Sequence, residues 1–168
     1  IFSISVSLVA LYAIETKARF FIPAVIALLV ISHNTLALFF IPVLLCYIAV
    51  NTRWDLLVPF CIGLGMSSFF FLPILMEKSL VLFNSISVSD PSTYFPASTS
   101  IIIYSLPFIV AAVIVGFAGK NIYTKERIFF IVLIFLSAFF ALGISSFFWK
   151  NALFVQYIQF PYRFFSLA

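Results

Sequence analysis

Few residues in this chain of 168 could do chemistry, and they stand at the ends of apolar stretches. The single histidine, His33, lies in the polar sequence 32–35, Glu77 ends an apolar run, and Arg163 follows the last one. An imidazole can act as acid, base or hydrogen-bond donor near neutral pH. A carboxylate can accept a proton or orient a sugar hydroxyl, and a guanidinium can bind a phosphate through two hydrogen bonds.

Each of these residues also has a purely structural interpretation, and the sequence leaves both open. His33 can simply occupy a turn, because the neighbouring Asn34 and Thr35 favour chain reversals. Glu77 can mark the end of a helix through an interfacial ion pair with the next residue, a lysine. Arg163 can extend its side chain to the lipid headgroups.

The composition argues against a soluble domain and against disorder. Hydrophobic residues make up 65% of the chain, aromatic residues 20% and charged residues only 8%. Soluble domains are about 25% charged, and disordered chains combine low hydrophobicity with high charge. We therefore expect a multi-pass protein of the cell membrane. The chain begins and ends inside apolar sequence, so we expect residues 1–168 to be one transmembrane region within a longer protein.

Six apolar runs predict an all-α fold, a polytopic bundle of about six transmembrane helices. A bilayer core of about 30 Å needs roughly 20 apolar residues of helix. Residues 79–99, between the fourth and fifth runs, are expected to form an extracytoplasmic loop. The runs, separated by charged or polar residues, are Ile1–Ile14, Phe20–Ser32, Leu36–Val50, Leu56–Met76, Ser100–Ala118 and Ile128–Phe148.

The stretch 20–50 decides the topology. One helix of this length would measure about 46 Å, too long for one upright span, whereas two halves are each short. If the chain reverses near His33, one side of the membrane carries Lys17, Arg19, Arg53, Lys120, Lys125 and Arg127 and the other only Lys78, Lys150 and Arg163. A single span would split the same charges almost evenly. Because cytoplasmic loops are enriched in Lys and Arg, the sequence favours the reversal, with His33, Glu77 and Arg163 on the extracytoplasmic side.

Small and aromatic residues predict how the helices pack and where they end. Gly63, Gly65 and the serines at 67 and 68 are expected to let another helix approach closely. Trp54 and Trp149 are expected at opposite membrane interfaces, where amphipathic rings gather. The chain shows no spacing of His, Cys or carboxylates typical of a metal site. Cys46 and Cys61 lie in apolar runs, where we expect small hydrophobic residues and not a disulfide.

Three stretches in this order resemble a known family. They are ISHNTLAL at 31–38, GLGMSSFFFLPILMEK at 63–78 and IQFPYRFF at 158–165. Together they resemble bacterial integral membrane proteins labelled 6-pyruvoyl-tetrahydropterin synthase-related, which are similar to YfhO-like proteins and to the GT-C glycosyltransferase superfamily. The label does not imply pterin chemistry here, because the soluble synthases use a histidine-ligated zinc and His33 is the only histidine.

The resemblance implies sugar transfer from a polyprenyl-phosphate donor on the extracytoplasmic face. His33 and Glu77 would then be catalytic and Arg163 would bind the donor phosphate. Expected partners are membrane lipids and this donor, with no nucleic acid, while the sequence predicts no particular cofactor. In the superfamily the key acidic motif lies in the first extracytoplasmic loop, and we expect any such loop to precede residue 1. The alternatives are a transporter or flippase subunit and a membrane protein without catalysis.

Overall fold

The computed structural model describes residues 2–76, 95, 106, 109–111, 113–114, 117, 124–151 and 164. The regular elements within these residues are all helices, which confirms the predicted all-α class for this part of the chain. The chain divides into two compact units, Ile1–Ser85 and Ile86–Ala168, and each is described by itself.

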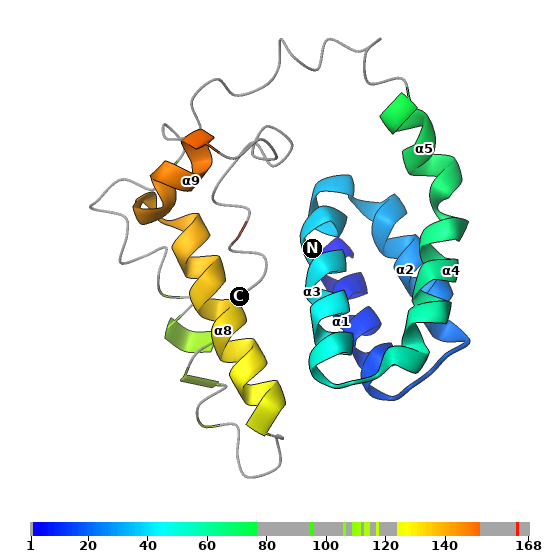
Figure 1. Ribbon diagram of the computed structural model, residues 1–168, viewed down its shortest axis with the longest axis horizontal. Helices are drawn as coiled ribbons and strands as arrows, with labels where there is room; N and C mark the ends of the chain where they lie inside the picture. Colours follow the sequence, from blue (N-terminus) through cyan, green and yellow to red (C-terminus); the bar gives the residue numbers. More distant parts are fainter. Residues whose placement is uncertain are drawn as a thin grey trace. The chain divides into compact units, whose positions relative to one another are not determined.

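Helices of unit 1 run alternately up and down. Figure 1 shows α1 and α3 antiparallel to α2 and α4, and α2 packs against both α1 and α4. The bounds follow the predicted apolar runs closely at α1, α2 and α3. The elements are α1 Phe2–Glu15, α2 Phe21–Ser32, α3 Asn34–Val50, the 3-10 turn η1 Trp54–Leu56, α4 Leu57–Met66 and α5 Ser68–Met76.

The chain reverses at His33. Helix α2 ends at Ser32, His33 has extended backbone angles (φ −167°, ψ 105°), and α3 begins at Asn34. The reversal brings together the two loops that flank the α2–α3 pair, since Arg19 and Asp55 form an ion pair of 2.6 Å. A continuous helix over this stretch would hold these residues more than 40 Å apart. The predicted turn is therefore confirmed.

Two helix ends in unit 1 share one geometry. After α1, the Lys17 N–H donates to the Ile14 carbonyl (3.2 Å) and the Ala18 N–H to the Ala13 carbonyl (2.9 Å). This is the Schellman pattern, in which the residue after the helix adopts the left-handed conformation. Lys17 has φ 54°, and Thr52, which follows α3, has φ 53°. Both charged loops of unit 1 thus start from a fixed helix end.

Small residues predominate on the buried face of α1. The buried face of α1 consists of Ser3, Val6, Ser7, Ala10, Ala13 and Ile14. Ser7 satisfies its hydroxyl within the helix by donating to the Ile4 carbonyl at 2.7 Å. Small residues at a spacing of three or four let neighbouring helices approach, as in membrane helix pairs.

Gly63 marks the closest approach of α4 to α2. A Cβ atom at Gly63 would lie 2.7 Å from the Pro23 carbonyl oxygen and 2.8 Å from the Ile26 Cβ, closer than real Cβ atoms come to other atoms. At Gly65 a Cβ would meet nothing within 4 Å. The predicted packing role is confirmed for Gly63, whereas Gly65 lies on the exposed face of α4.

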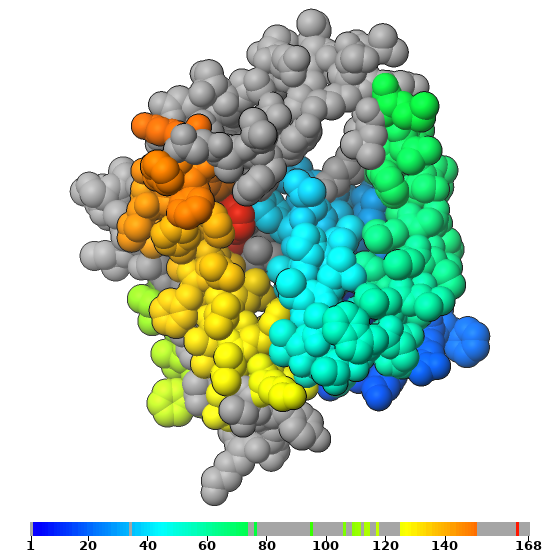
Figure 2. Space-filling view, viewed as in Figure 1, coloured from blue at the N-terminus to red at the C-terminus, as the bar shows by residue number. Residues whose placement is uncertain are grey.

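The predicted span 56–76 is interrupted at Ser67, between α4 and α5. The Ser67 N–H is shared between the Gly63 and Leu64 carbonyls, both at 3.2 Å, and the Ser67 hydroxyl donates to Leu64 at 2.9 Å. The Phe71 N–H donates to the Ser67 carbonyl at 3.3 Å, so hydrogen bonds continue across the break. Helices α4 and α5 accordingly form one continuous column of side chains (Figure 2).

Unit 2 contains a sharply bent pair of helices. Helix α8 covers Thr124–Ala141, the 3-10 turn η5 covers Gly143–Ser145 and α9 covers Ser146–Asn151. The two arms meet at 74°. Leu142 has extended backbone angles (φ −99°, ψ 153°) and separates them. The predicted apolar run 128–148 is thus covered by α8, η5 and part of α9, with a bend whose position the sequence did not indicate.

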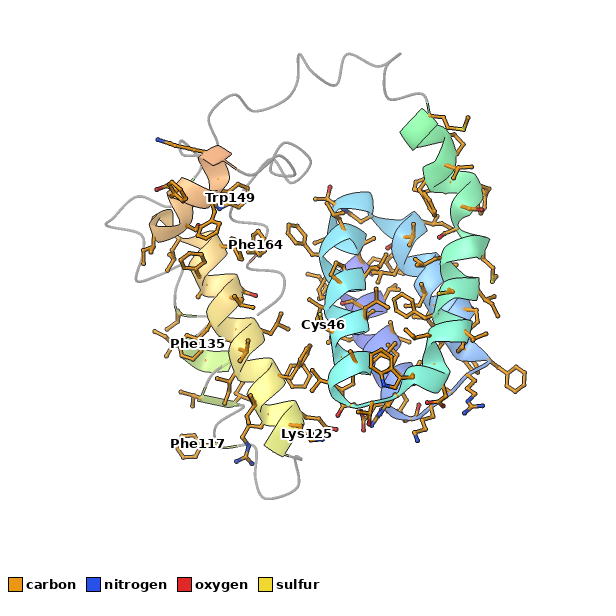
Figure 3. All side chains as sticks on the ribbon, viewed as in Figure 1. Cys46, Phe117, Lys125, Phe135, Trp149 and Phe164 are labelled. Atoms are coloured by element: carbon orange, nitrogen blue, oxygen red, sulfur yellow. The ribbon has the colours of Figure 1, made fainter. Side chains whose placement is uncertain are left out.

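Trp149 stabilises the bend. Its ring is 4% exposed, and its Nε1–H donates to the Phe140 carbonyl and to the Ser145 hydroxyl, both at 3.1 Å. A carbonyl left free at the end of α8 thereby gains a partner. The Phe164 ring stacks on Phe140 with centroids 5.0 Å apart and meets Trp149 edge-on at 6.0 Å (Figure 3). The position of Trp149 at a membrane interface stays a prediction.

No helix in the described part is by itself both long and apolar enough to cross a membrane; α8 and α9 pass that test only as a bent pair. Most of the predicted run 100–118 and of the predicted loop 79–99 lies outside the described residues.

Candidate functional site

His33 is exposed and holds the start of α3. Its Nδ1 accepts a hydrogen bond from the Leu36 backbone N–H at 3.4 Å, and its carbonyl accepts one from Ala37 at 2.9 Å. A side chain that accepts from the third helical residue is an N-cap, which satisfies a donor that the helix leaves free. His33 therefore has a structural role as the N-cap of α3, and its exposed ring stays a candidate for chemistry.

This hydrogen bond determines which chemistry the His33 ring offers. An Nδ1 that accepts a hydrogen bond carries no proton, so the neutral ring carries its proton on Nε2. In this tautomer the imidazole can donate to a hydroxyl or phosphate oxygen through Nε2. To act as a base it must first give up the cap, because a proton on Nδ1, gained directly or by tautomer exchange, removes the acceptor that the Leu36 N–H uses.

Of the three residues predicted for catalysis and phosphate binding, His33 is the one that the structure describes. Glu77 and Arg163 lie outside the described residues. Their proximity to His33 stays a prediction.

A second cluster of ionisable groups lies at the other end of unit 1. The Arg53 Nη2 donates to the Glu15 Oε1 at 2.9 Å, and Nη1 lies 2.9 Å from the other carboxylate oxygen. Nη1 also donates to the last carbonyls of α1, at Ile14 (2.9 Å) and Glu15 (3.0 Å). The Tyr47 hydroxyl donates to Glu15 Oε2 at 2.5 Å. Arg53 thus caps α1 and binds its terminal carboxylate with one group.

Electrostatics in this cluster favour an ionised Glu15. The hydrogen bond from Arg53 lowers the pKa of the Glu15 carboxyl from its usual 4.5; partial burial acts in the opposite direction, and the hydrogen bond from Tyr47 lowers the pKa further. Arg53 is 15% exposed, whereas the Glu15 side chain is 42% exposed. The guanidinium is therefore the more enclosed partner of the pair.

Sequence reasoning placed these residues in two loops on one side but did not pair them. Glu15 and Arg53 are 38 residues apart, and Arg19 and Asp55 are 36 apart. One feature of the sequence could have indicated these pairs. Each of the two polar breaks contains an acidic residue, and the reversal at His33 brings both breaks to the same end of the bundle. Two loops with mixed charge at one end predict cross-loop ion pairs.

Within the described residues, no three His, Cys, Asp or Glu side chains come together as metal ligands. Cys46 and Cys61 are exposed and carry free thiols. Cys46 projects from α3 (Figure 3), and Cys61 lies on the exposed face of α4.

Comparison of the chain with family models, curated proteins and solved structures finds no match in any of the three. The resemblance to 6-pyruvoyl-tetrahydropterin synthase-related membrane proteins and to the GT-C superfamily stays a prediction.

Proposed function

We propose that unit 1 is a membrane-embedded helical bundle of a multi-pass cell-membrane protein. The observation that carries this proposal is the apolar outer surface of residues 2–76. Large apolar side chains are exposed along every helix, among them Leu8, Tyr12, Phe21, Leu28, Leu38, Val58, Ile62, Phe69, Leu72 and Met76. Soluble monomers rarely expose continuous apolar surface of this kind, whereas lipid tails favour it.

The interior and the ends of unit 1 support the same proposal. Ser3, Ser7 and Ser67 are buried between the helices. Charged residues within 2–76 occur only at 15–19 and 53–55, at one end of the bundle. A bilayer requires this arrangement, because charges are costly in its core and are accommodated at the headgroups.

Loop charge sets the proposed orientation. The charged end carries Lys17, Arg19 and Arg53, whereas the turn at His33 carries no lysine or arginine. The positive-inside rule then places the charged end in the cytoplasm and His33 outside. Helix α2 has 12 residues, about 18 Å at 1.5 Å per residue, so the bilayer must thin locally around it.

A charge placed on an outer helix face tests the proposal. In a membrane, Ile62→Lys on the exposed face of α4 costs roughly 2.5–3.5 kcal/mol near the helix centre, so the amount of protein resisting carbonate extraction falls sharply. On a water-exposed surface the same change costs less than about 0.5 kcal/mol. Ile62→Met and Thr52→Lys, the latter at the charged end, are the controls and should leave membrane retention unchanged. Normal yield and retention of Ile62→Lys would contradict embedding.

A second candidate function, sugar transfer from a polyprenyl-phosphate donor, is favoured by the position of His33. The imidazole is exposed at the end opposite the basic loops, where an extracytoplasmic donor would arrive. Glu77 as a second catalytic group and Arg163 as the phosphate ligand complete this proposal. Transfer of labelled sugar by the full-length protein is the assay, with Arg163→Ala expected to abolish it. Solute uptake by reconstituted protein without sugar transfer would instead favour the transporter alternative.

A further inference from the structure

We propose that the charged end of unit 1 binds anionic phospholipid headgroups, with Lys17 and Arg19 meeting the phosphate. Phe20 and Trp54 would lie beside them at the boundary between headgroups and acyl chains. This inference rests on the proposed membrane embedding and adds to it a site and a lipid class.

Exposed aromatic rings are the first observation. Phe20 is 98% exposed and Trp54 58% exposed. Each is the sequence neighbour of one partner in the Arg19–Asp55 ion pair, whose 2.6 Å contact joins the α1–α2 loop to η1. Two large rings left outside the bundle next to paired charges suit a membrane interface, where Trp and other aromatic residues gather.

The accessible cations are the second observation. Lys17 is exposed, and its left-handed backbone is fixed by the end of α1. The Arg19 side chain is 61% exposed and contacts Asp55 through Nη2. Because a guanidinium has five N–H donors, this contact leaves donors that a phosphate oxygen can accept.

The net charge of the proposed site determines which class of lipid headgroup it prefers. Asp55 pairs with Arg19 and Glu15 pairs with Arg53, so the charge of Lys17 leaves this end with a net positive charge. Arg53 is enclosed and directed at α1 and Glu15, so it belongs to the bundle and not to the site. An anionic headgroup such as phosphatidylglycerol satisfies the excess charge, whereas phosphatidylcholine brings a cation of its own.

The experiment uses the protein extracted from membranes in mild detergent and offered an equimolar mixture of phosphatidylglycerol and phosphatidylcholine. Native mass spectrometry measures the ratio of the two lipids that remain bound. The variants are Lys17→Gln, Arg19→Gln and Asp55→Asn, with Lys150→Gln as a control for net charge. Circular dichroism verifies that each variant keeps its helix content.

We expect the unsubstituted protein to retain phosphatidylglycerol preferentially. Lys17→Gln and Arg19→Gln should each reduce that preference about fivefold, the usual contribution of one cation near an anionic surface. Asp55→Asn breaks the same ion pair but frees Arg19, so it should keep or raise the preference, and Lys150→Gln should leave it unchanged.

Equal losses in Arg19→Gln and Asp55→Asn would overturn the site, because they would show that the ion pair acts only by holding the loops together. No preference in the unsubstituted protein would overturn it as well. Carbonate extraction of the same membranes reports embedding separately, so a failure of the lipid site is distinguishable from a failure of the proposed function.

Discussion

Arg53 and Glu15, 38 residues apart, make a two-point contact in which each guanidinium terminal nitrogen lies 2.9 Å from a different carboxylate oxygen. The same guanidinium donates to the last two carbonyls of α1. One side chain therefore ties the end of α1 to the α3–α4 loop and neutralises the carboxylate at that end.

Loss of the Arg53 guanidinium should destabilise unit 1 more than loss of the Glu15 charge. Arg53→Gln removes the ion pair and both carbonyl contacts, and should lower the free energy of unfolding by about 2 kcal/mol. Glu15→Gln keeps the carbonyl contacts and should cost less. Titration with SDS in mixed micelles measures both, and Lys150→Gln is the control. Equal effects of the two substitutions would show that the carbonyl contacts add nothing.

Stability should also depend on pH through Glu15. Because the hydrogen bond from Arg53 lowers the pKa of the folded carboxyl below 4.5, the folded state binds fewer protons than the unfolded state between the two values. The contribution of Glu15 is thus fully present above pH 4.5 and is lost as the pH falls through the lowered pKa. Glu15→Gln should remove this part of the acid destabilisation. An unchanged acid profile in Glu15→Gln would assign the destabilisation to other groups.

Adding one methyl group at two nearby glycines should have opposite effects. Gly63→Ala forces a Cβ into the Pro23 carbonyl, so α2 and α4 must separate at a cost of roughly 1–3 kcal/mol. Gly65→Ala meets open space and should gain up to about 1 kcal/mol from higher helix propensity. Unfolding in mixed micelles measures both substitutions. A neutral Gly63→Ala would contradict the close approach of the two helices.

Two substitutions separate the cap of His33 from its chemistry. Asn is a good N-cap and Ala is a poor one, so His33→Asn should keep the stability that His33→Ala loses, about 1 kcal/mol. If the imidazole takes part in sugar transfer, both variants lose transfer to the same degree in the full-length protein. Transfer that survives in His33→Asn would leave His33 with the capping role alone.

The sequence predicted the bounds of α1, α2 and α3 because polar or charged residues interrupt the apolar runs at their ends. It also predicted the reversal at His33, from loop charge combined with a length too great for one span. These features depend on local polarity, which a single sequence displays directly.

The positions of the breaks at Ser67 and after Ala141 were not predicted, because both breaks fall inside apolar runs and carry no charge. At the second break the stabilising partner, Trp149, lies eight residues beyond Ala141 and acts on the Phe140 carbonyl. The pairing of Glu15 with Arg53 depends on tertiary structure, and no local pattern specifies which of several charges will meet. The roles of Glu77 and Arg163 stay predictions, because both residues lie outside the part of the chain that the structure describes.

The proposed topology is tested most directly by labelling single cysteines in intact cells with a membrane-impermeant maleimide. The native thiols are first removed as Cys46→Ala and Cys61→Ala, and Thr52→Cys or His33→Cys is then introduced. We predict that the cysteine at 33 reacts from outside, while the cysteine at 52 reacts only after the membrane is permeabilised. Labelling of both positions from outside would contradict a bundle that crosses the membrane between its charged end and His33. Labelling of 52 alone would contradict the proposed orientation.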